Sequence, residues 1–274
     1  MASLHPSKNG DFTSNLRDSM SQKQENRVTG VEETLDRINQ LPDALLVQIL
    51  SLLPTRDAVA SSVLSRRWRY LWNSIDNFHF VVRNDNKAEN FISFVDHVLA
   101  HCTCPKVRKF KLDLNDMSNR EFELIISLWI SFAVERNVED VVFLCSFDDE
   151  ELYYEWPPLS MCTCSSLITL DWSCCTFDKE SIIEWKSLKS LKLQYILFDD
   201  DDIVNLLSCC PALETMELSL FEGFRRVEIT NSNLKRLTLA SHKWPCSGNE
   251  DSLEIFAPHL QHLDISRSSW TYQV

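Results

Sequence analysis

Apolar residues follow a helical spacing in a short segment near the N-terminus. Between Leu41 and Pro54 they recur every three or four positions, and extra leucines widen the stripe beyond one helix face. Pro42 suits a first helical turn, where its missing N–H is not needed, and Asp43 favours the positive end of the helix dipole. Pro54 cannot continue the helix. The pattern therefore predicts a helix that begins near Pro42 and ends before Pro54.

Two further short helices are predicted directly after the first. Thr55 is placed to cap a second helix that extends toward Val63, and Ser65 is placed to cap a third. Spacings of three and four residues put the large apolar residues of the third helix on one face: Trp68, Leu71 and Trp72. Residues 35–80 thus hold more apolar surface than so small a unit buries by itself. We expect a partner to cover the excess.

A second pattern begins near Val107 and repeats along the chain. Its core is L-x-x-L-x-L, and seven copies have their first apolar residue at positions 107, 138, 167, 188, 213, 234 and 260. Alternation within each copy predicts a strand with one apolar face. Because no single copy can bury that face alone, the copies are expected to stack on one another.

Helical patterns lie before the first copy, at residues 91–100, and between copies, at residues 122–134 and 203–207. The aspartates at 199–202 come directly before the third of these and indicate a dipole-matched helix start rather than a calcium site. The predicted fold class is therefore α+β and multidomain. A three-helix module at residues 35–80 precedes an irregular, right-handed α/β solenoid at residues 81–274, and residues 1–34 are expected to form a disordered leader.

Stacked strands leave alternate side chains pointing outward along a concave wall. Five such positions lie between the last two apolar residues of a copy: Asp171, Lys192, Glu217, Thr238 and Asp264. If this wall binds a partner, they are the candidate binding residues, and a merely solvated face is the alternative interpretation.

The net charge of −13 is unevenly distributed. Residues 36–80 carry +1 and residues 81–274 carry −13. An acidic repeat region disfavours a phosphate backbone as ligand and favours a basic protein surface. A helix-turn-helix interpretation, with Arg66, Arg67 and Arg69 on a recognition helix, is disfavoured for the same reason. We expect no nucleic-acid partner.

Ten cysteines occur in a long chain whose N-terminal 30 residues contain no apolar core of a signal peptide. Reduced thiols, a cytoplasmic or nuclear location and no membrane partner are therefore expected, since no run of eighteen apolar residues occurs either. Paired cysteines are separated by one residue or by none, unlike those of structural zinc sites. We expect adjacent thiols to point apart and to pack as small apolar residues, with no metal bound.

Catalytic chemistry is not indicated by the sequence. Only four glycines occur, so phosphate-binding loops are not expected, and no cysteine has an evident base beside it. We expect no cofactor, no catalytic residues and no enzymatic activity.

The N-terminal module closely resembles the F-box. Leu41-Pro42, the leucine-rich first helix, Leu53-Pro54 and the segment 63–72 stand in the order of that motif. The resemblance implies docking to the Skp-type adaptor of a cullin-based ubiquitin ligase. Carried over by position, the adaptor-binding residues would be Leu41, Pro42, Ile49, Leu52, Leu53, Val63, Leu64, Trp68, Leu71 and Trp72. For each of them, a place in the module's own core is the alternative.

The region behind the module resembles leucine-rich repeats, and the combination resembles the plant F-box/leucine-rich-repeat proteins. That resemblance implies a substrate receptor of an SCF-type ubiquitin ligase. The alternatives are an F-box scaffold, or a ligand receptor, that acts outside a ligase. Many members of the family continue into a further C-terminal domain, so the chain is expected to be truncated. Its last copy, at residues 260–265, is accordingly expected to be the least protected.

Overall fold

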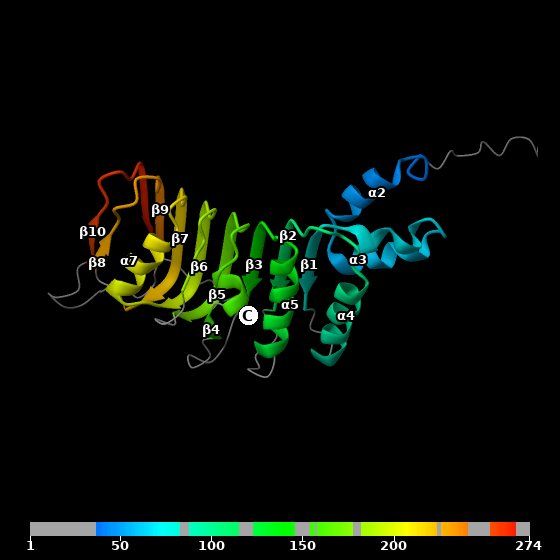
Figure 1. The fold of residues 1–274 in the computed structure, drawn as a ribbon, viewed down its shortest axis with the longest axis horizontal. Coiled ribbons are helices and arrows are strands. Elements are labelled where there is room, and N and C mark those ends of the chain that lie inside the picture. Colours follow the sequence, from blue (N-terminus) through cyan, green and yellow to red (C-terminus); the bar gives the residue numbers. More distant parts are fainter. Residues whose placement is uncertain are drawn as a thin grey trace, which may run out of the picture. The chain divides into compact units, whose positions relative to one another are not determined.

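The structure is a computed structural model that describes residues 37–82, 88–114, 123–145, 154–156, 158–177, 182–223, 226–240 and 253–266. The predicted leader at residues 1–34 lies outside these residues. The chain divides into two units, residues 1–46 and 47–274, each of which is described by itself. The second unit holds almost all of the secondary structure (Figure 1).

Short helices form the N-terminal part, as the apolar spacing predicts. Helix α2 spans Asp43–Leu50 and helix α3 spans Thr55–Ala60. Two 3₁₀ segments follow, η1 at Ser61–Val63 and η2 at Trp68–Ser74. The expected third α-helix is thus a 3₁₀ helix, in which short bonds such as Trp68 N–H to the Ser65 carbonyl (3.2 Å) close the turns.

Both predicted side-chain caps in this part are wrong. Pro54 occupies the N-cap position of α3, which has no side-chain cap, and Thr55 is the first helical residue. The Thr55 hydroxyl instead accepts a hydrogen bond of 2.8 Å from the backbone N–H of His79. The Ser65 hydroxyl is buried without a hydrogen-bond partner, and η2 begins three residues later. Thr55 therefore ties the helical part to the first strand rather than starting a helix.

A parallel sheet dominates the second unit. Eight strands run in chain order, and β4 (Tyr154–Trp156) adds to the far half of β5. The eight are β1 (Asn77–Val81), β2 (Lys109–Asp113), β3 (Asp140–Leu144), β5 (Thr169–Phe177), β6 (Ser190–Leu197), β7 (Thr215–Glu222), β9 (Arg236–Ala240) and β11 (His262–Ser266). Strands β8 (Arg226–Glu228) and β10 (Glu254–Phe256) pair separately.

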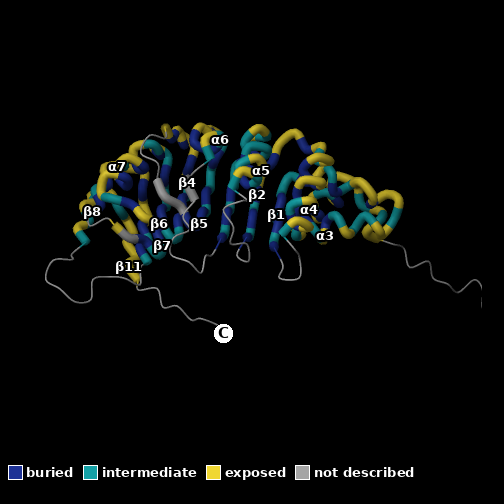
Figure 2. The backbone as a smooth tube through the Cα atoms, turned by 90° about the horizontal axis from the view of Figure 1, so that it is seen from below, coloured by how far each residue is buried: buried dark blue, intermediate teal, exposed yellow. Residues whose placement is uncertain are grey.

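Each of the seven predicted copies contributes one strand of this sheet. The strand begins two residues after the first apolar position of its copy, at residues 109, 140, 169, 190, 215, 236 and 262. Six of those first apolar residues are fully buried: Val107, Val138, Leu167, Leu188, Leu213 and Leu234. Burial then alternates along the strands, as in β2 and β3. In Figure 2 the inner strands alternate between dark blue and teal, whereas β11 is yellow because all five of its residues are exposed.

The three predicted helical segments are helices in the structure. They are α4 (Ala88–His101), α5 (Glu123–Glu135) and α7 (Asp200–Cys209), and a short α6 (Leu159–Cys162) is added. Helices α5, α6 and α7 lie along the same side of the strands (Figure 2). Asp199 caps α7 in a capping box with Asp202, which confirms the interpretation of the acidic run as a helix start.

Residues directly before the strands also form hydrogen bonds between neighbouring repeats. The N–H groups of Arg108, Glu139, Lys189, Glu214 and Lys235 each bond to a carbonyl in the preceding repeat, at 2.7–3.2 Å. Their side chains alternate in sign along much of the row. We call Asp76, Arg108, Glu139, Lys189, Glu214 and Lys235 the charged ladder.

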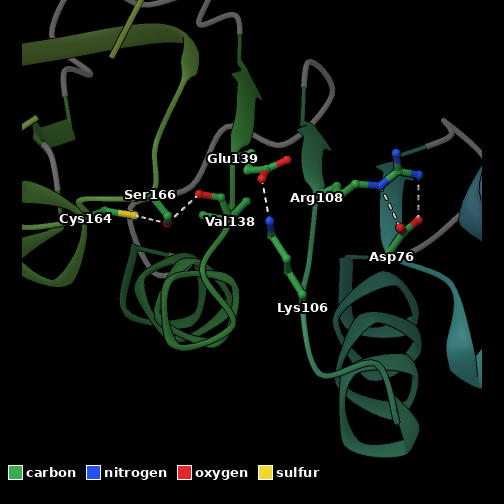
Figure 3. Close-up of polar contacts among 7 residues, drawn as sticks. All are labelled: Asp76, Lys106, Arg108, Val138, Glu139, Cys164 and Ser166. Atoms are coloured by element: carbon green, nitrogen blue, oxygen red, sulfur yellow. Dashed lines mark hydrogen bonds and ion pairs between the residues drawn. The ribbon is translucent and has the colours of Figure 1, made fainter. Parts of the chain in front are cut away.

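Figure 3 shows the beginning of the charged ladder. The Arg108 guanidinium donates to both carboxylate oxygens of Asp76, at 2.6 and 3.2 Å, and Lys106 donates to Glu139. Farther along, the Glu214 carboxylate lies 3.9 Å from the Lys189 ammonium and 3.8 Å from that of Lys235. The side chains thus reinforce the backbone register between neighbouring strands.

Strands β5, β6 and β7 share a bend at one register position. Cys174, Tyr195 and Leu220 have φ angles of 60°, 53° and 56°, in the left-handed region that non-glycine residues seldom adopt. The residues on either side of them stay in register across the three strands. The bend shifts the inside–outside alternation, so that Gln194 and Tyr195 are both half-buried while Ile196 is buried.

Candidate functional site

Five apolar side chains remain exposed in the helical part of the second unit. Leu52, Val63 and Leu64 are 81%, 85% and 67% exposed, and the other two are Ile49 and Leu53. We call these five residues the exposed apolar segment. The N–H groups of Leu52 and Leu53 bond to the Ile49 and Leu50 carbonyls, and Pro54 is the N-cap of α3, so these two leucines lie in the turn that joins α2 to α3. Such a concentration of exposed large apolar residues is typical of a protein-binding surface.

The two tryptophans of the predicted adaptor-binding set lie in the core. Trp68 and Trp72 are both less than 10% exposed, and the Trp72 ring packs against the rings of His97 and His101 on α4. Leu71 is half-buried between them in sequence. These residues can therefore support a binding surface, but the tryptophans do not form one.

Leu41 and Pro42 belong to the first unit. Leu41 is half-buried and Pro42 is exposed, and the Pro42 carbonyl accepts bonds from the N–H groups of Leu45 and Leu46. Pro42 thus starts α2 as predicted. Leu45 is also exposed, although the predicted adaptor-binding set does not include it.

One exposed aromatic residue was missed by the sequence reasoning. Tyr70 is 64% exposed, and the Arg69 guanidinium lies 5.5 Å from its ring centre. Arg66 and Arg67 are exposed nearby in sequence. The spacing of three and four from Trp68 excludes Tyr70 from the buried face, which is the signal that could have found it.

The five predicted wall residues lie in one row of the sheet. Strand register pairs Asp171 with Lys192, Lys192 with Glu217, Glu217 with Thr238, and Thr238 with Asp264. The same row continues toward β1 through Val142, Lys111 and His79. Neighbouring strands are about 4.8 Å apart, so the row is a closely spaced line of side chains. We call it the polar strand row.

Charges in the polar strand row partly pair with one another. The Lys192 ammonium lies 3.1 Å from a Glu217 carboxylate oxygen. Asp171 Oδ1 is buried without a hydrogen-bond partner. Burial raises the pKa of the Asp171 carboxyl, the negative charge of Glu217 raises it further, and Lys192 opposes both. At the other end, burial and the charge of Lys111 lower the pKa of His79.

The described cysteines are mostly buried, as predicted, but one pair does not point apart. Six of the eight are buried: Cys104, Cys145, Cys162, Cys164, Cys174 and Cys210. Cys102 and Cys104 face each other with 2.9 Å between their Sγ atoms. The expectation of diverging thiols fails here because residues 102–104 form a loop after α4, in which Thr103 is bonded to the Asn73 carbonyl and the side chains on either side of it meet.

A cavity of about 400 Å³ opens between α4 and α5. Its wall combines Asp96, Cys102, Leu128, Trp129 and Arg136 with other side chains of the two helices. The Trp129 indole N–H donates to Asp96 Oδ1 at 2.8 Å, which joins the helices at the cavity wall. Among the described residues, no group of three or more potential ligands is arranged to hold a metal ion. No described helix combines the length and the apolar composition that a membrane span requires.

Two family models match the chain. The F-box domain matches residues 38–80, the part that contains the exposed apolar segment. The model described as "FBD-associated F-box protein At5g56370, LRR repeats" matches residues 126–273, which is more than half of the chain.

Curated proteins of Arabidopsis thaliana match most of the chain. The F-box/FBD/LRR-repeat protein At5g56420 is 31% identical over 84% of this chain and 55% of its own length. The F-box/FBD/LRR-repeat protein At3g52680 is 35% identical over 84% of this chain and 50% of its own length. F-box/LRR-repeat protein 13 is 32% identical over 88% of this chain and 53% of its own length. The chain thus spans about half the length of the curated relatives it matches.

Proposed function

The chain belongs to the F-box/LRR-repeat family, and from that premise we propose that it is the substrate-recognition subunit of an SCF-type ubiquitin ligase. F-box domains generally bind Skp-type adaptors. In this proposal the F-box docks to such an adaptor, through which a cullin scaffold is recruited, and the repeats capture a protein substrate. The exposed apolar segment carries the proposal.

These side chains contribute favourable free energy when a partner buries them. Burying one leucine side chain completely contributes about 1.5–3 kcal/mol. Leu52 and Leu53 are adjacent and both exposed, so an adaptor that covers them gains a large part of its binding free energy there. The role of each residue of the predicted adaptor-binding set remains part of the proposal.

The strands of the repeat region support a substrate-binding role that is separate from adaptor docking by the F-box. One strand per repeat, stacked in parallel and in chain order, is the arrangement that we interpret as an irregular α/β solenoid. Its polar strand row offers charged and polar groups at regular spacing to a substrate. We propose that the protein supplies binding and positioning, without a catalytic group of its own, while the ubiquitin-transfer chemistry belongs to its partners.

Adaptor docking is tested by a double substitution, Leu52→Ala with Leu53→Ala. Pull-down of a Skp-type adaptor should fall at least about tenfold, because more than about 1.4 kcal/mol of apolar contact is removed. The control is Leu124→Ala with Leu128→Ala on α5, outside the F-box match, where the side chains are 79% and 69% exposed against 81% and 38% for Leu52 and Leu53. Equal binding by both folded double variants would contradict the proposed docking surface.

Substrate capture by the polar strand row is tested separately. Asp171→Lys with Glu217→Lys reverses two charges of the row and should weaken capture of a basic substrate while adaptor binding persists. Capture should also weaken as salt rises, since exposed charges are screened within about 8 Å at physiological ionic strength. A substrate that contacts only residues outside the repeats would overturn this assignment.

Two further parts of the proposal concern its cellular setting. Co-purification of a cullin with the chain supports the ligase role, whereas an adaptor complex without any cullin favours a scaffold that acts outside a ligase. We also propose a cytoplasmic or nuclear location, and a fluorescent fusion of the chain tests it directly.

A further inference from the structure

Two thiols lie together in the loop that follows α4. The Sγ atoms of Cys102 and Cys104 are 2.9 Å apart, and residues 102–104 belong to neither a helix nor a strand. A disulfide bond requires about 2.05 Å between the sulfurs, so an approach of less than about 1 Å would join them.

The backbone between the two cysteines is held in place by η2. The Thr103 N–H donates to the Asn73 carbonyl at 2.7 Å, and the Thr103 hydroxyl donates to the same carbonyl at 3.1 Å. The Ser74 and Thr103 hydroxyls are a further 3.2 Å apart. Because Thr103 is anchored on one side, both flanking thiols are kept on the other, where they meet.

The surroundings of Cys102 favour its reaction with a small oxidant. Cys102 is half-buried and lines the cavity between α4 and α5, whereas Cys104 is buried behind it. The hydrogen bond from the Cys104 thiol lowers the pKa of Cys102 to about 7, and the positive charge of Arg136 acts in the same direction. The same hydrogen bond and burial raise the pKa of Cys104, which therefore stays protonated.

We propose that Cys102 and Cys104 form a dithiol that a hydroperoxide oxidises to an intrachain disulfide, with Cys102 as the reacting thiol and Cys104 as the resolving thiol. The Cys102 thiolate attacks the peroxide, the O–O bond breaks, and a sulfenic acid and an alcohol (or water) are formed. Cys104 then attacks the sulfenic sulfur, the S–S bond forms, and hydroxide leaves with the Cys104 proton as water. Two electrons pass from the two sulfurs to one peroxide.

Two other cysteine pairs that the structure describes lack this geometry. Cys162 and Cys164 have the same spacing, but both are buried, and their thiols contact the Pro158 carbonyl at 3.8 Å and the Ser166 hydroxyl at 3.4 Å. In the adjacent pair of Cys209 and Cys210, burial raises the pKa of Cys210 to about 12. These pairs are therefore internal controls for cysteine spacing alone.

The experiment treats the purified full chain with one equivalent of hydrogen peroxide and maps the cysteine peptides by mass spectrometry. We expect the peptide with Cys102 and Cys104 to lose two hydrogens at least about tenfold faster than the peptides with the other pairs, since reactivity follows thiolate character and access. Cys162→Ser with Cys164→Ser, the matched control, should leave this oxidation unchanged.

Single substitutions test the order of the two steps. In Cys104→Ser, the sulfenic acid at Cys102 cannot be resolved, so it should accumulate and be trapped by dimedone. In Cys102→Ser, neither the disulfide nor the dimedone adduct should form at this loop. The proposal is overturned if Cys162 and Cys164 oxidise as fast, or if Cys102 of the unaltered chain gives a dimedone adduct in place of a disulfide.

Discussion

The helical segment at residues 49–70 and the parallel sheet use the same apolar residues in opposite ways. Leu52 and Val63 are more than four-fifths exposed, whereas Leu191 and Leu193 in β6 are each 1% exposed. The sheet obtains its apolar contacts within the chain, because each repeat covers the next. The helical segment leaves much of its apolar surface in water, and that surface is available to a partner.

The two regions also differ in how their helices begin. Helix α7 beside the sheet starts with a reciprocal capping box between Asp199 and Asp202, with bonds of 2.9 and 2.8 Å. Neither α3 nor η2 has a side-chain cap. Helix α7 is thus fixed at its start by its own sequence, although the short α6 of the same region also lacks a side-chain cap. The helical segment depends instead on tertiary contacts such as the one between Thr55 and His79.

The largest expected effect comes from the sheet core. Leu193→Ala removes a fully buried side chain from β6 and should lower the free energy of unfolding by about 2–5 kcal/mol, through lost burial and the cavity left behind. Denaturant unfolding measures it. The control is Leu197→Ala in the same strand, where the side chain is half-exposed and the change should stay below about 1.5 kcal/mol. Equal effects at the two positions would break the comparison.

The next effect concerns the capping box. Asp199→Ala removes the acceptor for the Asp202 N–H and should cost about 0.5–2 kcal/mol in the free energy of unfolding. Asp201→Ala lies in the same helical turn but outside the box, so only the dipole contribution is lost, about 0.3–1 kcal/mol. Thermal unfolding of both variants distinguishes them. A larger loss for Asp201→Ala would show that the box is not what fixes the start of α7.

A smaller effect is expected from the ion pair in the polar strand row. A double-mutant cycle with Lys192→Ala and Glu217→Ala should give a coupling free energy of about 0.2–1 kcal/mol, because both side chains are more than a third exposed and screened by water. The coupling should shrink further at high salt. A coupling well above this range would mean that the row stabilises the fold rather than serving as an open binding surface.

The smallest effect is expected in the exposed apolar segment. Leu52→Ala should change the free energy of unfolding by less than about 0.5 kcal/mol, because the side chain has little contact to lose. Denaturant unfolding alongside Leu193→Ala provides the direct contrast. If Leu52→Ala destabilised the chain as strongly as a core substitution, the segment would be part of the fold and not a surface left for a partner.

Periodicity predicted the strands that carry the repeat core and missed those that do not. In the copies that begin at Val107 to Leu234, buried apolar residues before and within each strand recur at recognisable positions, and in the strand of the last copy the same apolar pattern is exposed. Strand β1 escaped prediction because only Phe78 and Phe80 alternate in it, although their rings pack into the same core as Phe110. The three-residue strands β4, β8 and β10 are too short for any period to show.

The candidate site was predicted less completely, because the burial and the hydrogen-bond partners of its residues depend on tertiary contacts that the sequence pattern does not show. The F-box resemblance placed Trp68 and Leu64 in one adaptor-binding set, but only the fold shows that Trp68 is buried and Leu64 is exposed. The role of Thr55 depends on the His79 N–H that approaches it from β1, and the Ser65 hydroxyl is buried without a hydrogen-bond partner, neither of which the local sequence indicates. Register, in contrast, follows from the repeat itself, so the alignment of Asp171 with Asp264 across the sheet was predictable.

The charged ladder has a consequence for how the number and order of the repeats can evolve. Glu214 separates Lys189 from Lys235, and both lysines lie within 4 Å of it. Loss of the repeat that contains Glu214, by unequal recombination within the gene, would bring two lysines side by side and leave no carboxylate between them. Although each ion pair contributes little by itself, deletion replaces attraction by repulsion at that junction. The charge pairing at each junction therefore depends on which repeats are adjacent, so the order of the repeats is under constraint as well as their individual residues.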